Sequence, residues 1–81
     1  MPVNIDLITE DLRNMIAKVV EKTPEMVTDN ILFSNLGADS MMMLEIMVAT
    51  ERKYKIEIPE EHLSRMVNLK ETVNIIKSLQ R

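Results

Sequence analysis

The residues whose chemistry is easiest to place are six in a row, Leu36-Gly37-Ala38-Asp39-Ser40-Met41. They lie where an irregular polar stretch gives way to an apolar segment with helical spacing. Asp and Ser are preferred helix caps, so the sequence predicts that a helix begins at Ser40. A helix N-terminus has unpaired backbone N–H groups and a partial positive charge. A hydroxyl held there is exposed and a phosphate attached to it is stabilised, so Ser40 fits a serine modified through a phosphodiester.

The same pair has a simpler interpretation, because most Asp-Ser pairs ahead of an apolar run only cap a helix. The surrounding sequence favours more than a cap. Leu36-Gly37-Ala38-Asp39-Ser40, followed by a helix and then Glu57-Ile58-Pro59-Glu60-Glu61, resembles the acyl carrier protein family over nearly the whole chain. The resemblance implies that Ser40 carries 4'-phosphopantetheine, which a phosphopantetheinyl transferase takes from coenzyme A. Asp39 belongs to the same motif, and both roles, cap and part of the cofactor site, are compatible.

Size and composition indicate one small folded domain. The chain has 81 residues, 46% of them hydrophobic and 28% charged. We expect residues 1–81 to form a single acyl carrier domain, which is either free-standing, as the start at Met1 suggests, or excised from a longer protein. Phe33 and Tyr54 are the only aromatic residues, so the core is expected to be aliphatic and rich in methionine, and therefore adaptable.

The absence of cysteine excludes disulfides, thiolate metal sites and a cysteine nucleophile. A thioester carrier of this composition needs a thiol from an added group, and the resemblance supplies one at the end of the phosphopantetheine arm. The sequence has neither a membrane-span-length apolar run nor the pattern of a signal peptide, so we expect a cytoplasmic protein.

Charge is unevenly distributed along the chain. Residues 1–61 hold twelve acids and six bases, whereas residues 62–81 hold one acid and four bases. An acidic region around Ser40 disfavours nucleic acid and favours basic protein partners, although a solvated surface also explains most of these charges.

Apolar spacing predicts an all-α fold, a small four-helix bundle with a long first loop and a short third helix. The first helix covers about 6–21, with Asn4 or Asp6 as cap and Thr23-Pro24 as its stop. Its buried stripe is Ile5, Ile8, Leu12, Met15, Ile16 and Val19. The connection over 23–38 is expected to be anchored on the core by Met26, Val27, Ile31, Leu32, Phe33 and Leu36.

Gly37, the only glycine, is expected to hold a backbone conformation that other residues resist. Further helices are predicted over 40–54, over 60–66 and from about 70. The stripe of the last one is Leu69, Val73, Ile76 and Leu79.

The predicted helix over 40–54 has apolar residues on two faces. The core face is Met43, Ile46, Met47, Thr50 and Tyr54. Met41, Leu44 and Val48 fall on the other face, which is either a second buried face or a surface for partner proteins. With Glu45 and Glu51 beside them, they suit a partner enzyme with a basic docking surface. The resemblance implies that such partners are acyl-transferring and chain-elongating enzymes, and we expect the carrier to be a monomer.

The chain departs from the fatty-acid-synthesis members that it resembles. Met42 stands where those proteins usually have an acid, and four residues, Arg52, Lys53, Lys55 and His62, dilute an acidic region. We therefore expect a specialised carrier for a polyketide, lipid or other secondary pathway.

Two other functions stay open from the residues alone. One is a non-carrier helical adaptor that binds partners through the methionine-rich second helix, since four of the eight methionines lie between Met41 and Met47. The other is a peptidyl or aminoacyl carrier, although Gly37-Ala38-Asp39-Ser40 differs from the Gly-Gly-x-Ser usual there. An enzyme is disfavoured because no Gly-x-Ser-x-Gly elbow accompanies Ser40 and His62. A single histidine without cysteine is also poor support for a metal site.

Overall fold

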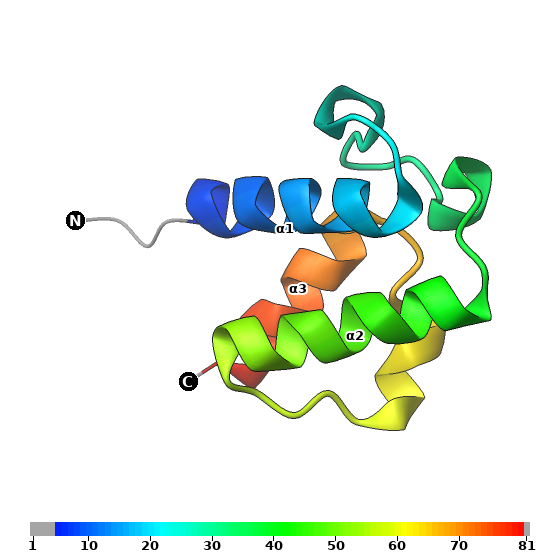
Figure 1. Ribbon diagram of the computed structural model, residues 1–81. Coiled ribbons are helices and arrows are strands. Elements are labelled where there is room, and N and C mark those ends of the chain that lie inside the picture. The colour runs from blue at the N-terminus through cyan, green and yellow to red at the C-terminus, as the bar shows by residue number, and fades with distance from the viewer. Residues whose placement is uncertain (1–4, 81) are drawn as a thin grey trace.

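The computed structural model describes the backbone of residues 5–80 and the side chains of residues 7–80. The order of elements is α1 (Ile5–Val20), η1 (Pro24–Met26), η2 (Phe33–Leu36), α2 (Ser40–Tyr54), η3 (Glu60–Arg65) and α3 (Leu69–Leu79), where η denotes a 3-10 helix (Figure 1). No strand occurs in this part of the chain. The predicted all-α fold is confirmed, and its short third helix, η3, is a 3-10 helix.

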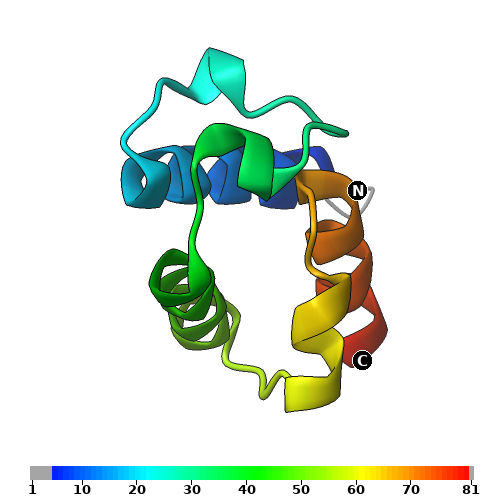
Figure 2. The same ribbon diagram turned by 90° about the vertical axis from the view of Figure 1, so that its right-hand side faces the viewer.

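The three α-helices point in different directions. In Figure 2, α2 is seen nearly along its axis, while α1 lies across the view and α3 runs down one side. α1 packs against both α2 and α3, and these two helices together cover its apolar face. The long connection between α1 and α2 crosses from one helix to the other over the top of the molecule (Figure 2).

The core confirms the predicted stripes and widens them. On α1, Leu12 and Ile16 are fully buried, Ile8, Met15 and Val19 pack partly buried against the core, and Ala17 and Val20 are buried as well. The predicted cap Asn4 and the side chains of Ile5 and Asp6 lie outside the described residues. The prediction of Asp6 as the cap was wrong, because the backbone of Ile5 and Asp6 is already helical. On α3 the buried set is Leu69, Thr72, Val73, Ile75 and Ile76, with Leu79 partly buried.

Both long helices before η3 end on a left-handed residue that is not glycine. Glu21 has φ 60° after α1 and Lys55 has φ 54° after α2. After α1, the Lys22 N–H donates to Ala17 O at 2.9 Å, the bond that closes a Schellman motif. α1 therefore ends before the predicted stop at Thr23-Pro24 is reached, and Pro24 instead begins η1.

The connection from α1 to α2 is anchored by fewer apolar residues than predicted. Val27, Phe33 and Leu36 are buried and Ile31 is partly buried, but Met26 and Leu32 are exposed, so the prediction for these two was wrong. Leu32 has an extended backbone between two inward-facing neighbours, and successive side chains of an extended chain point to opposite sides.

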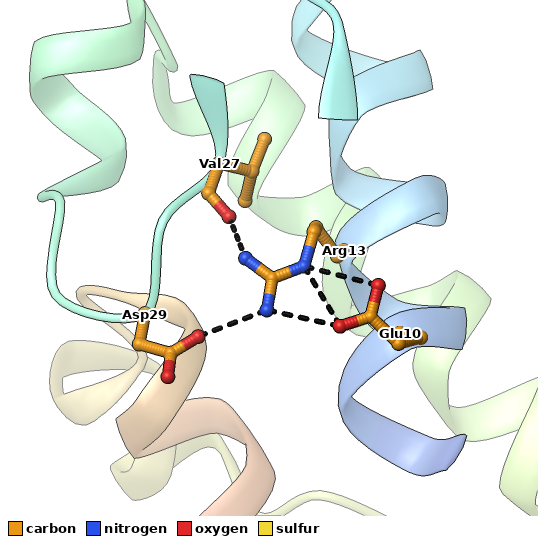
Figure 3. A network of polar contacts seen from close by, with 4 residues as sticks. All are labelled: Glu10, Arg13, Val27 and Asp29. Atoms are coloured by element: carbon orange, nitrogen blue, oxygen red, sulfur yellow. Dashed lines mark hydrogen bonds and ion pairs between the residues drawn. The ribbon is translucent and has the colours of Figure 1, made fainter. Parts of the chain in front are cut away.

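Polar contacts of Arg13 hold the same connection against α1 (Figure 3). The Arg13 guanidinium donates to the Val27 carbonyl, to Asp29 Oδ1 at 3.0 Å and to the Glu10 carboxylate at 3.3 Å. The Asp29 carbonyl in turn accepts from the Lys70 N–H at 3.0 Å. The loop that leads to α2 is thus tied to the middle of α1 and to the start of α3.

Candidate functional site

The turn before Ser40 depends on Gly37. This residue ends η2 with φ 87°, in the left-handed region, and a Cβ built on it would meet nothing within 4 Å. Glycine is therefore required by the backbone angle and not by lack of space, as predicted. The Gly37 and Ala38 N–H groups each donate at 3.1 Å, to Ser34 O and Phe33 O respectively. Because Phe33 and Leu36 are buried, the turn has a fixed position on the core.

Asp39 caps α2 as predicted. Its backbone is extended, and its Oδ1 accepts a hydrogen bond from the Met42 N–H at 2.9 Å. Ser40 is consequently the first residue of the helix, and both Asp39 and Ser40 are exposed. The first N–H groups of a helix have no partner within it, so the Ser40 hydroxyl lies at an open, electropositive helix end.

An apolar hollow of about 280 Å³ opens beside this helix end. Ala38, two residues before Ser40, and Met43, three residues after it, both contribute to the wall. The rest of the wall comes from the preceding connection and from η3 and the residues after it: Leu32, Phe33, Ser34, Leu63, Met66 and Val67. A group attached to Ser40 would therefore have an apolar space within reach.

The core face of α2 is as predicted. Ile46 and Thr50 are fully buried, and Met43, Met47 and Tyr54 pack partly buried against the core. The Thr50 hydroxyl is satisfied within the helix, since it donates to Ile46 O at 2.7 Å.

The other face of α2 is not buried. Met41, Leu44 and Val48 are 70%, 45% and 38% exposed, so the interpretation as a second buried face is wrong. These three side chains share a shallow apolar depression, the α2 groove, whose lining is Met41, Leu44, Glu45, Val48, Ala49, Arg52 and Lys53.

Glu51 does not join the other predicted partner-binding residues. Its carboxylate accepts from the Ile58 N–H at 2.8 Å and so holds the segment that follows α2. Arg52 and Lys53 line the groove instead, together with Ala49. The signal for Arg52 was available in the sequence, because it follows Val48 by four residues and so continues the same helical face.

His62 is half-buried in η3, and its Nδ1 has no hydrogen-bond partner among the described residues. No group of three or more His, Cys, Asp or Glu residues within that same part of the chain is placed to hold a metal ion. No helix over residues 5–80 has the length and apolar character needed to cross a bilayer.

Comparison of the sequence with known proteins shows the family of this chain. Residues 10–76 match the family model described as a phosphopantetheine attachment site. The chain is 31% identical over 71 residues to an acyl carrier protein of Campylobacter concisus, a match that covers 86% of this chain and 92% of that protein. It is 36% identical over 69 residues to an acyl carrier protein of Helicobacter pylori, covering 84% and 88% respectively. The chain belongs to the acyl carrier protein family, and it is a carrier protein and not an enzyme.

The prosthetic group of this family is covalently attached phosphopantetheine. The structure offers a position that fits it, because Ser40 is exposed at the N-terminus of α2, where an attached phosphate is stabilised. When bound, the group supplies the thiol that this cysteine-free chain lacks.

Proposed function

We propose that this protein holds acyl intermediates as thioesters on a 4'-phosphopantetheine arm attached to Ser40. It presents them to enzymes of fatty acid, polyketide or related lipid biosynthesis. The observation that carries the proposal is the position of Ser40, an exposed hydroxyl on the first residue of a capped helix. Membership of the acyl carrier protein family supports it.

Each residue around Ser40 has a part in this function. Gly37 and the buried Leu36 hold the turn that presents the serine. Asp39 orders the first turn of α2 through Met42 N–H, and its exposed carboxylate is available to the phosphopantetheinyl transferase. In the transfer from coenzyme A, the Ser40 hydroxyl oxygen would lose its proton and bond to the pantetheine phosphorus, while the pyrophosphate bond breaks and adenosine 3',5'-bisphosphate leaves. The resulting phosphodiester stays at the positive end of the helix.

The partners we propose are the transferase and the acyl-transferring and chain-elongating enzymes that use the arm. They dock on Met41, Leu44 and Val48, with a basic group facing Glu45. The chain works as a monomeric, cytoplasmic carrier formed by residues 1–81.

We further propose a specialised pathway. The exposed basic residues Arg52 and Lys53 of α2 support it, as does Met42, which packs against the core at a position where the fatty-acid-synthesis members usually have an acid. If a standard set of fatty-acid-synthase enzymes elongates chains on this protein at the rate of their own carrier, the specialised pathway is wrong.

The modification itself is tested by intact mass. The protein is incubated with coenzyme A and a broad-specificity phosphopantetheinyl transferase, beside the Ser40→Ala and Ser34→Ala variants. Ser34 is a matched control because it is also an exposed serine, in η2. We expect the wild type and Ser34→Ala to gain one phosphopantetheine and Ser40→Ala to gain none.

The alternatives predict other results in the same assay. An adaptor that is not a carrier gains no mass while a control carrier is fully converted. A peptidyl or aminoacyl carrier gains the arm but is then loaded by amino-acid-activating enzymes and not by acyl transferases.

A further inference from the structure

The α2 groove is basic at the end far from Ser40. Arg52 and Lys53 line it there, and Glu45 is its only acid. Arg52 is exposed and makes no ion pair with any residue that the structure describes. Lys53 makes a long contact with Asp11, 3.9 Å between Nζ and Oδ2, and its Nζ lies 5.8 Å from the centroid of the neighbouring Tyr54 ring. The positive charge at this end is therefore largely free to meet a partner.

The basic end continues from α2 onto α1. A second hollow, lined by Asp11, Asn14, Met15, Lys18, Ala49 and Lys53, shares Ala49 and Lys53 with the α2 groove. Lys18 thus lines a hollow adjacent to the α2 groove, and Asp11 is the only acid that lines this hollow. Three cations against one carboxylate make this end basic, although the whole chain has a net charge of −3.

We propose that the enzymes that act on the group carried by Ser40 insert an apolar segment into the α2 groove and place carboxylates against Arg52 and Lys53. This inference rests on the proposed function. Arg52 follows Ser40 by twelve residues of one helix, a distance of about 18 Å at about 1.5 Å per residue. A partner of this kind carries acidic side chains about 18 Å from the entrance of its active site. Between these acidic side chains and the active-site entrance, the partner carries the basic group that faces Glu45.

The order of charges along the α2 groove, with Glu45 nearer Ser40 and Arg52 and Lys53 at the far end, discriminates between partner enzymes. The net charge of −3 attracts basic surfaces at long range, whereas contacts at the groove are decided by the nearest groups. An enzyme that is basic along its whole docking surface meets repulsion at Arg52. One with an acidic far end gains two ion pairs at the rim of the interface.

The test uses two synthetic amphipathic helical peptides with the same apolar residues, one flanked by glutamates and the other by lysines. Their binding is measured by fluorescence anisotropy on the Ser40→Ala variant at about 0.15 M salt, where a Debye length of about 8 Å screens the long-range attraction of the net charge. This variant carries no arm, so the result is independent of the modification assay. We expect the acidic peptide to bind at least about fivefold more tightly than the basic one, the effect of two exposed ion pairs.

Substitutions then locate the effect. Arg52→Glu is expected to remove or reverse the preference, with Arg52→Gln intermediate. Lys77→Glu changes the net charge by the same amount at an exposed position of α3 and is expected to keep it. Leu44→Ser is expected to weaken both peptides equally, because it removes apolar contact without changing charge. Circular dichroism confirms that each variant is folded.

Three results would overturn the proposal. The first is a basic peptide that binds as tightly as the acidic one or more tightly. The second is an equal effect of Arg52→Glu and Lys77→Glu. The third is self-association in sedimentation experiments that excludes both peptides, which would make a second copy of this chain the occupant of the groove.

Discussion

The cap of α2 allows stability and modification to be separated experimentally. In Asp39→Ala the hydrogen bond from Met42 N–H to Asp39 Oδ1, 2.9 Å long, is lost. Removing such a cap costs about 1 kcal/mol of unfolding free energy. In a domain of this size, 1 kcal/mol corresponds to roughly 4–8 °C in Tm. We therefore expect Asp39→Ala to melt about 4–8 °C below the wild type.

Two companion variants divide this effect into its causes. Asp39→Asn keeps an acceptor oxygen for Met42 N–H but removes the carboxylate, and it is expected to stay within about 0.5 kcal/mol of the wild type. Asn68→Ala removes the corresponding cap of α3, where Asn68 Oδ1 accepts from Glu71 N–H at 2.8 Å. It destabilises the protein by a similar mechanism on another helix, away from the Ser40 turn.

The assay pairs thermal unfolding, followed by circular dichroism, with initial rates of phosphopantetheine transfer at a temperature where all variants are folded. We expect Asp39→Ala to slow transfer, because the helix start that presents Ser40 is loosened and the carboxylate is gone. Asn68→Ala should transfer at the wild-type rate. Asp39→Asn should transfer as slowly as Asp39→Ala if the transferase contacts the carboxylate.

Two results would refute this reasoning. A Tm of Asp39→Ala within about 1 °C of the wild type would show that the cap does not stabilise α2. Equal slowing by Asn68→Ala and Asp39→Ala would show that transfer follows global stability and not the geometry at Ser40.

Three more predictions follow from contacts elsewhere in the chain. Arg13→Met removes the donors to Val27 O and Asp29 and should lower the unfolding free energy in urea by about 1–2 kcal/mol, whereas wild-type stability would show that the loop does not depend on them. Burial, and next the charge of Asp11, raise the pKa of Tyr54 above its usual 10.0, so above about pH 10 the folded state binds more protons than the unfolded state and stability falls as pH rises. Tyr54→Phe should flatten that fall, and because the buried hydroxyl has no partner among the described residues it should cost no more than about 0.5 kcal/mol of unfolding free energy at pH 7. Unfolding free energies from urea titrations at pH 9 to 11 that fall as steeply with pH in the variant as in the wild type would contradict this. A medium-length acyl group loaded on the arm should raise Tm by at least about 5 °C if two of its methylenes are buried, for example in the hollow beside Ser40, and an unchanged Tm would argue against sequestration.

Local signals explain which parts of the fold could be predicted. α2 runs over Ser40–Tyr54, the predicted range, because a cap pair precedes it and apolar residues with helical spacing continue through it. The left-handed backbone of Gly37 was predictable because no other glycine exists in the chain. The left-handed backbone angles of Glu21 and Lys55, which follow α1 and α2, were not predicted, since these residue types do not signal them.

Misplaced residues share one cause, which is that the type of a residue does not say what its side chain will face. Leu32 lies between Ile31 and Phe33 in an extended segment and points to solvent, while its neighbours point inward. Glu51 was predicted to face partners, but the segment after α2 folds back so that Ile58 N–H reaches its carboxylate. These outcomes depend on how the connections return to the core.

The sequence by itself determined the cap, the turn and the helix that place a hydroxyl at Ser40, because each depends on residues within a few positions of one another. Only the tertiary structure decided that Met41, Leu44 and Val48 stay exposed, and that Lys18 of α1 lines a hollow that shares Lys53 with the α2 groove. The physical reason is that burial and charge proximity depend on which helices pack together, and helical spacing on one segment carries no information about its neighbour.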